Sequence, residues 1–70
     1  MYLKKLKDLR EDHDLTQQQI ANILKITRQQ YSLYEIGKRD LPIDLLIILS
    51  DFYDVSTDYI LDIKKRQITV

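Results

Sequence analysis

"LTQQQI" at residues 15–20 is followed, eleven positions later, by the similar phrase "ITRQQY" at residues 26–31. Each phrase contains a threonine, Thr16 or Thr27, that suits the N-cap of a helix, and a glutamine three residues later that can be its reciprocal partner in a capping box. The apolar residues at the two ends of each phrase are placed to form a hydrophobic staple around the cap. The repeated phrase therefore predicts two helix starts.

The spacing of these starts leaves room for only about two turns of helix and a three-residue turn between them. We expect the second helix to end at Gly37, the only glycine, which is placed for a left-handed C-cap. The apolar residues at helical spacing, which we expect to face inward, are Ile20, Ala21, Leu24, Tyr31 and Tyr34. Two short helices joined by a tight turn form a helix-turn-helix.

Helical patterns continue on both sides of this unit. Leucines at helical spacing predict a helix from residue 3 that ends near His13. Pro42 fits the first turn of a fourth helix that runs from Ile43 to Asp54, and Ser56 is a plausible cap for a short fifth helix. Residues 63–70 show no helical pattern and could be a frayed tail or a short pairing strand.

Composition supports one small all-α domain over residues 1–70, with its core within about 3–61. One glycine and one proline leave little room for long loops, and without cysteine there are no disulfides. No apolar run approaches the ~18 residues of a membrane span, so we expect a cytoplasmic protein with no membrane partner.

Charge is unevenly distributed although the net charge is zero. Residues 1–39 hold eight Lys/Arg and five Asp/Glu, whereas residues 40–63 hold six Asp and no base. Three further bases follow at residues 64–66. A basic front and an acidic back suit a protein that presents one side to a polyanion, although small proteins often show such imbalance by chance.

The stretches "LREDHDLTQQQIANILKITRQQYSLYEIGKRDLP" (residues 9–42) and "LLIILSDFYDVSTDYIL" (residues 45–61) resemble the helix-turn-helix regulators of the phage-repressor type, also called the Cro/cI or XRE type. The resemblance covers residues 3–61. It implies a compact five-helix bundle, the lambda-repressor-like DNA-binding domain, with the helix-turn-helix at helices 2 and 3. It also implies that helix 3 lies in the major groove of DNA, in proteins that commonly act as dimers and repress or activate transcription.

Two residues depart from the pattern of that family. Lys25 occupies the turn position where the family usually has glycine, and a positive φ there would strain the lysine by about 1 kcal/mol. Leu33 stands where a polar, groove-facing residue is common, which leaves the base contact at that position open.

With Tyr31 and Tyr34 facing inward, the outer face of the helix that begins at Thr27 carries four other side chains. Arginine can grip guanine, glutamine can pair with adenine, and leucine can contact a thymine methyl group. The alternative is that arginine and glutamine are simply good surface helix formers. We favour direct contact with DNA bases for Arg28 and Gln29. Ser32 and Leu33 are further candidates, for which base contact and plain surface placement both stay open.

Phosphate contacts are expected around this helix. The positive dipole end of the preceding helix suits phosphate, and basic residues after Gly37 would bind the backbone on the far side of the groove. Plain capping and solvated surface charge are the alternatives. The candidates are Gln17, Gln18, Thr27, Lys38, Arg39 and, in second place, Arg10. The resemblance suggests that Arg10 chiefly forms a structural ion pair with Glu35.

The fourth helix is apolar nearly all round, so some of its side chains exceed what a small core can hide. We expect Ile47, Ile48 and Phe52 to form a dimer interface. The alternative is that the helix simply has an unusually apolar exposed surface and no partner.

No residue set suggests catalysis. His13 stands between two aspartates, but the chain has no other histidine and no cysteine, so no metal, cofactor or enzymatic activity is expected. The predicted function is a sequence-specific, double-stranded-DNA-binding transcriptional regulator, with repression the expected mode, acting as a homodimer on an inverted repeat. The alternative is an antitoxin-like module in which helix 4 or the tail binds a partner protein.

Overall fold

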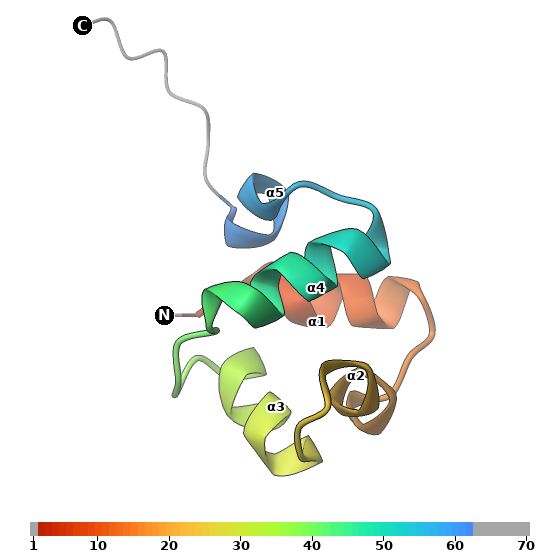
Figure 1. Ribbon diagram of the computed structural model, residues 1–70, viewed down its shortest axis with the longest axis vertical. Coiled ribbons are helices and arrows are strands. Elements are labelled where there is room, and N and C mark those ends of the chain that lie inside the picture. The colour runs from red at the N-terminus through yellow and green to blue at the C-terminus, as the bar shows by residue number, and fades with distance from the viewer. Residues whose placement is uncertain (1, 63–70) are drawn as a thin grey trace, which may run out of the picture.

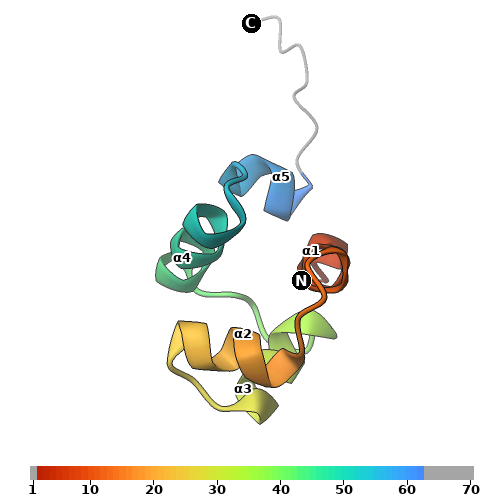
Figure 2. The same cartoon turned by 90° about the vertical axis from the view of Figure 1, so that its right-hand side faces the viewer.

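The structure is a computed structural model, which describes residues 2–62 and shows only α-helices within that range. The helices are α1 (Lys4–Asp12), α2 (Gln17–Leu24), α3 (Arg28–Glu35), α4 (Ile43–Tyr53) and α5 (Thr57–Leu61). In Figure 1, α2 and α3 lie together at one end of the molecule, α5 lies at the other, and α1 and α4 lie between them. Turned by 90°, α1 and α4 are seen on opposite sides (Figure 2). The all-α, five-helix prediction is confirmed.

Both predicted capping boxes are present. The hydroxyl oxygen of Thr16 accepts the amide hydrogen of Gln19 at 3.1 Å, and the Gln19 side-chain oxygen accepts the amide hydrogen of Thr16 at 2.8 Å. Thr27 and Gln30 make the same two hydrogen bonds at 3.1 and 3.0 Å. The two phrases of the sequence thus begin α2 and α3 by one device, which satisfies amide groups that the helix itself cannot pair.

Residues with a left-handed backbone conformation follow α2 and α3. Lys25, after α2, has φ +59°, and Gly37, after α3, has φ +83°. The amides of Gly37 and Lys38 donate back to the carbonyls of Tyr34 and Leu33, which is a Schellman arrangement. A Cβ on Gly37 would lie 3.0 Å from Tyr2 Cα, so glycine is required there both for its φ and for space.

The fourth helix differs from its predicted bounds. Pro42 is the N-cap, one residue before the first turn where it was expected, because its ψ of 150° is extended. The helix ends at Tyr53, since Asp54 adopts φ +56° and leaves the helix. Ser56 caps α5 as predicted, with its hydroxyl oxygen accepting the Tyr59 amide hydrogen at 3.1 Å. Residues 63–70, predicted as a tail or strand, lie outside the described residues.

The described helices share one core. Its largest fully buried side chain is Tyr31 on α3, and Tyr34 packs against the same core from a half-buried position. The buried apolar residues are Leu3, Leu6, Leu9, Ile20, Ala21, Leu24, Tyr31, Leu45, Leu46, Leu49, Tyr53 and Ile60. This core fixes the angle between α2 and α3 and so decides which face of α3 remains outside. None of the described helices has the length and apolar character needed to span a membrane.

Candidate nucleic-acid interface

The outer face of α3 carries the four side chains predicted to contact bases. Arg28 and Gln29 are exposed at the N-terminal end of the helix, and Ser32 and Leu33 are half-buried one turn later. Tyr31 and Glu35 are buried on the opposite side. Neither Arg28 nor Gln29 folds into the interior, and Lys25 interrupts the chain with a left-handed turn, so α2 and α3 are separate helices. The structure therefore presents polar groups suited to base edges at the tip of α3.

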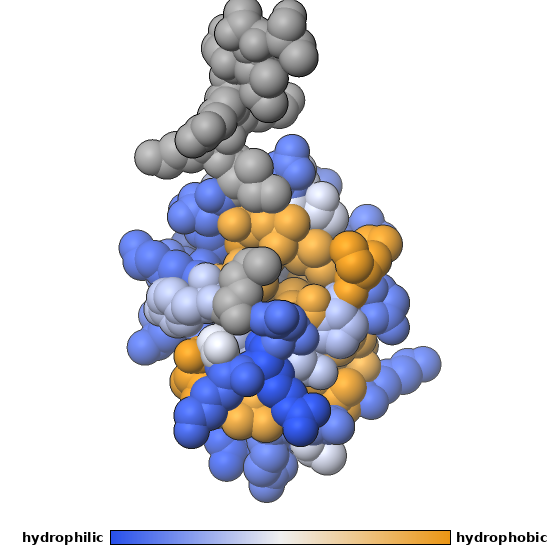
Figure 3. Space-filling view, turned by 90° about the vertical axis from the view of Figure 1, so that its left-hand side faces the viewer, coloured by the Kyte–Doolittle hydropathy of each residue, from blue (hydrophilic) through white to orange (hydrophobic). Residues whose placement is uncertain are grey.

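Lys38 and Arg39 follow the left-handed Gly37 and are both exposed. Their backbone amides donate to the carbonyl of Leu33 at 3.0 and 3.2 Å, so the chain that carries them is tied to the end of α3. Figure 3 views the side on which the start of α1 and the α3–α4 connection lie, and strongly hydrophilic side chains gather there at the lower centre, with apolar areas on several sides of them. These two bases therefore stand at a fixed place relative to α3.

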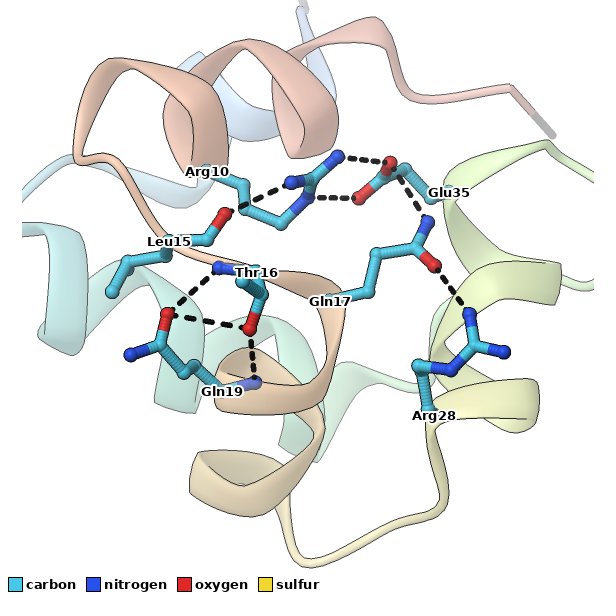
Figure 4. Close-up of polar contacts among 7 residues, drawn as sticks. All are labelled: Arg10, Leu15, Thr16, Gln17, Gln19, Arg28 and Glu35. Atoms are coloured by element: carbon cyan, nitrogen blue, oxygen red, sulfur yellow. Dashed lines mark hydrogen bonds and ion pairs between the residues drawn. The ribbon is translucent and has the colours of Figure 1, made fainter.

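Arg10 on α1 and Glu35 on α3 form a bidentate ion pair (Figure 4). The Arg10 Nε donates to Glu35 Oε2 at 2.9 Å and Nη2 donates to Oε1 at 3.0 Å. The third nitrogen, Nη1, donates to the Leu15 carbonyl at 2.9 Å. Burial raises the pKa of Glu35, but the hydrogen bonds from Arg10 and other donors outweigh burial and hold that pKa below its ordinary value. The pair joins α1 to α3 and also holds the loop before α2.

Gln17 extends this pair to the protein surface. Its Nε2 donates to Glu35 Oε1 at 3.2 Å, and its Oε1 accepts a longer hydrogen bond of 3.4 Å from Arg28 Nη1. Figure 4 shows the resulting row from Arg10 through Glu35 and Gln17 to Arg28. The sequence did not reveal this row, because it depends on the angle between α2 and α3. The signal that could have suggested it is that Gln17 and Arg28 hold equivalent positions, one after the cap, in the two repeated phrases.

The remaining predicted phosphate residues lie at helix starts. Gln18 is exposed, and its side chain donates to Asn22 at 2.9 Å, whereas its backbone amide lies in the first turn of α2, where helix geometry supplies no acceptor. The Thr27 hydroxyl oxygen accepts from Gln30, which leaves its own hydrogen free to be donated. The Arg10 side chain is only 14% exposed and uses all three nitrogens inside the fold.

Charge is unevenly distributed along the described part of the chain. Between residues 15 and 39 the bases Lys25, Arg28, Lys38 and Arg39 are exposed, and the single acid, Glu35, is buried and paired. Residues 40–62 carry six exposed aspartates and no base. Asp58 and Asp62 lie on and just after α5, at the opposite end from α2 and α3 (Figure 2), whereas Asp40 lies in the α3–α4 connection directly after Arg39.

The outer side of α4 is apolar. Ile47, Ile48 and Phe52 are 50%, 40% and 43% exposed, and Ile43 is 69% exposed. Leu45, Leu46, Leu49 and Tyr53 fill the inner side of the same helix. The structure thus leaves the three predicted dimer residues uncovered in the single chain and adds Ile43 to them.

His13 lies beside the end of α1. Its Nδ1 is 2.9 Å from the Leu9 carbonyl oxygen, and its ring packs against Tyr53 with the ring centres 5.0 Å apart. Within residues 2–62, no group of three His, Cys, Asp or Glu side chains is arranged to hold a metal ion.

The structure thus combines a helix-turn-helix with an exposed polar tip of α3 that basic residues flank. This is the arrangement of the helix-turn-helix class of DNA-binding domains. The Helix-turn-helix family model (HTH_3) matches residues 6–60, and this chain belongs to that family of phage-repressor-type (XRE) transcriptional regulators. The resemblance found in the sequence is thereby confirmed.

Several known proteins are similar to it. The uncharacterized HTH-type transcriptional regulator YobD of Bacillus subtilis (strain 168) is 44% identical over 61 residues, covering 87% of this chain and 54% of the relative. Antitoxin PezA of Streptococcus pneumoniae serotype 4 is 40% identical over 53 residues, covering 76% and 34%. The cryptic phage CTXphi transcriptional repressor RstR of Vibrio cholerae is 33% identical over 55 residues, covering 79% and 50%.

Among solved structures, a transcriptional regulator from Listeria innocua superposes with a TM-score of 0.87 at 23% identity, covering the whole of this chain and 65% of that one. This likeness confirms the fold. The chain spans about half the length of YobD and RstR and a third of PezA.

Proposed function

We propose that this chain binds double-stranded DNA in a sequence-specific manner and regulates transcription, with repression the expected mode. The observation that carries the proposal is the exposed tip of α3: two complete capping boxes hold α2 and α3 so that Arg28 and Gln29 project outward. Membership of a family of regulators, and the similarity to a phage repressor, support it.

The tip of α3 enters the major groove in this proposal. Arg28 would bind the O6 and N7 atoms of guanine and Gln29 the N6 and N7 atoms of adenine, each pair discriminating by about 1–3 kcal/mol. Ser32 and Leu33 would contact bases one turn further along the helix. Gln30 takes no part, because its side chain closes the capping box of Thr27.

Phosphates would be bound on both sides of the groove. The first-turn amides of α2, the free hydrogen of the Gln17 Nε2 group and the Thr27 hydroxyl lie on one side, and Lys38 and Arg39 lie on the other. Arg10 supports this surface from behind by holding Glu35, which in turn holds Gln17. The phosphate contact suggested for Arg10 is left out of the interface, because its side chain is only 14% exposed and each of its three nitrogens already donates a hydrogen bond inside the fold.

Two copies would act together. A dimer formed through Ile47, Ile48 and Phe52 of α4 would place two α3 helices in successive major grooves, about 34–36 Å apart, and would read an inverted repeat. Asp44 and Asp51 lie two turns apart on the same exposed side of α4. In such a dimer their carboxylates would come close to those of the other copy, and the like charges would repel each other.

Selection of bound duplexes from a random pool, at about 0.1 M salt, tests the proposal, and sedimentation equilibrium on the same protein gives its oligomeric state. The expected result is an enriched inverted repeat whose half-sites are one helical turn apart, or a multiple of it, bound by a dimer. A pool that remains random after repeated rounds, at low salt as well, contradicts the proposed function.

A second candidate is a protein-binding module of the antitoxin kind, favoured by the similarity to antitoxin PezA and by the uncovered apolar side of α4. Under this alternative, a purified stoichiometric protein partner would be released by Ile47→Asp and retained by Arg28→Ala. Under the DNA-binding proposal, Arg28→Ala changes which duplexes are selected.

A further inference from the structure

Leu33 is an apolar side chain among the polar side chains of Arg28, Gln29 and Ser32 near the tip of α3. It lies one turn after Gln29 on the outer face of α3, and it is half-buried. Within residues 2–62 it belongs neither to the core nor to the partly buried apolar side chains that pack against the core, such as Ile23, Ile26 and Tyr34. Leu33 therefore lies outside the core cluster and stays partly exposed on the same face as Gln29.

Leu33 is also held firmly. Its carbonyl oxygen accepts the amide hydrogens of Lys38 and Arg39, and the Schellman arrangement at Gly37 fixes the end of the helix. The backbone of Leu33 is therefore fixed relative to Arg28 and Gln29 before DNA is bound. Because little backbone freedom is lost on binding, contact with one base costs little conformational entropy.

Leucine has no hydrogen-bond donor or acceptor, so it cannot distinguish the O4 atom of thymine from the amino group of cytosine. The one apolar group that base edges offer in the major groove is the C5-methyl of thymine, and unmodified cytosine lacks it. We propose that Leu33 reads the C5-methyl group of a pyrimidine in each half-site, so that thymine and 5-methylcytosine are both accepted and uracil and unmodified cytosine bind more weakly. Methylation of cytosine would then strengthen binding. This inference rests on the proposed function.

The test uses the full chain and the duplex obtained by selection. In one half-site, each thymine in turn is replaced by uracil, and its pair with adenine is also replaced by a cytosine–guanine pair with and without the 5-methyl group. Dissociation constants are measured by fluorescence anisotropy. The expected result is one position at which uracil weakens binding about fourfold, the ratio that corresponds to burial of one methyl-sized group. At that position, 5-methylcytosine paired with guanine should bind about fourfold more tightly than unmodified cytosine.

Three variants assign the effect to Leu33. Leu33→Ala should bring the ratio between the thymine and uracil duplexes close to one, whereas Leu33→Met, which keeps an apolar chain of similar volume, should retain it. Ile36→Ala is the matched control, because Ile36 is another exposed apolar residue, 54% exposed, but lies at the C-cap, at the opposite end of α3 from Arg28. This variant should keep the wild-type ratio. Circular dichroism verifies that all three are folded.

Two results would overturn the inference: wild-type affinity that does not depend on the methyl group at any substituted position, or a methyl effect of full size in Leu33→Ala. Failure to select any duplex contradicts the proposed function and this inference together. Selection of a defined operator whose methyl groups have no effect contradicts the inference alone.

Discussion

Glu35 is the residue at which three helices meet. It accepts two hydrogen bonds from Arg10 on α1 and one from Gln17 on α2, and its carboxylate is buried on the inner side of α3. An unpaired carboxylate in this place would carry a large desolvation cost, so the pair fixes the orientation of α3 more than it adds net stability. Gln17 then connects this fixed point to Arg28 at the surface.

Acid should weaken the fold through Glu35. Because the pKa of this carboxyl is held below its ordinary value, its contribution to the free energy of unfolding is present above about pH 4.3 and is lost as the pH falls through the folded pKa. Urea unfolding of the wild type between about pH 7 and pH 3 should show this loss. Glu35→Gln should be less stable at neutral pH and should lose less on acidification. Equal acid sensitivity of the two proteins would show that Glu35 is not the group responsible.

Lys25 is strained by its left-handed conformation, with φ +59°. Lys25→Gly should remove this strain and raise the free energy of unfolding by up to about 1 kcal/mol, partly offset by the greater freedom of glycine in the unfolded chain. Lys25→Ala keeps a Cβ and should not be more stable than the wild type. Chemical denaturation of the three proteins measures the difference, and a gain with alanine as large as that with glycine would rule out strain as its cause.

At the scale of helices, the sequence predicts best where the signal is local. Thr16, Thr27 and Ser56 could each be assigned as caps because a capping residue and its partner lie within four positions. The bounds of α4 were less accurate: proline has a φ that suits either the N-cap or the first turn, and Asp54 ends the helix in a left-handed conformation that glycine more often adopts. The Gln17–Arg28 contact and the uncovered Ile36 depend on tertiary packing, which local patterns do not contain.

The capping box of α2 should be measurable on its own. Thr16→Ala removes the acceptor for the Gln19 amide and should lower the free energy of unfolding by about 1 kcal/mol, within a range of about 0.5–2. Thr16→Ser keeps the hydroxyl and should lose much less. Urea unfolding compares the three proteins. Because Thr16 is exposed and outside the core, neither substitution changes core packing, and the difference measures the cap alone. If serine were as destabilising as alanine, the methyl group and not the cap would be the stabilising feature.

For the whole molecule, the two proposed interactions use parts of opposite charge: DNA binding uses the basic end and dimerisation uses the acidic side of α4. The end that carries α2 and α3 is basic and suits phosphate, whereas the charged residues on the exposed sides of α4 and α5 are all acidic. Asp44 and Asp51 share the exposed side of α4 with Ile47 and Ile48, so two copies that meet there bring like charges together.

Salt should therefore act in opposite directions on dimerisation and on DNA binding. Raising it from about 0.05 to about 0.5 M should strengthen the α4-mediated dimer by screening the aspartates, and should weaken DNA binding by reducing the gain from counterion release. Sedimentation equilibrium measures the first effect and anisotropy the second. Asp51→Asn should dimerise more tightly at low salt with a smaller response to salt, and Ile47→Ser should dimerise weakly throughout. A dimer unaffected by Ile47→Ser must form through another surface.

The central claim is that the two capped helices present Arg28 as a reader of bases and Lys38 as a phosphate contact. It is tested most directly by measuring the affinities of wild type, Arg28→Ala and Lys38→Ala for the selected operator and for all of its single-base variants. Arg28→Ala should lose about 1–3 kcal/mol of discrimination at one base position, whereas Lys38→Ala should weaken every duplex about equally and reduce the salt dependence by about one unit of slope. If both variants weaken all sequences alike, Arg28 does not read a base, and the claim is contradicted.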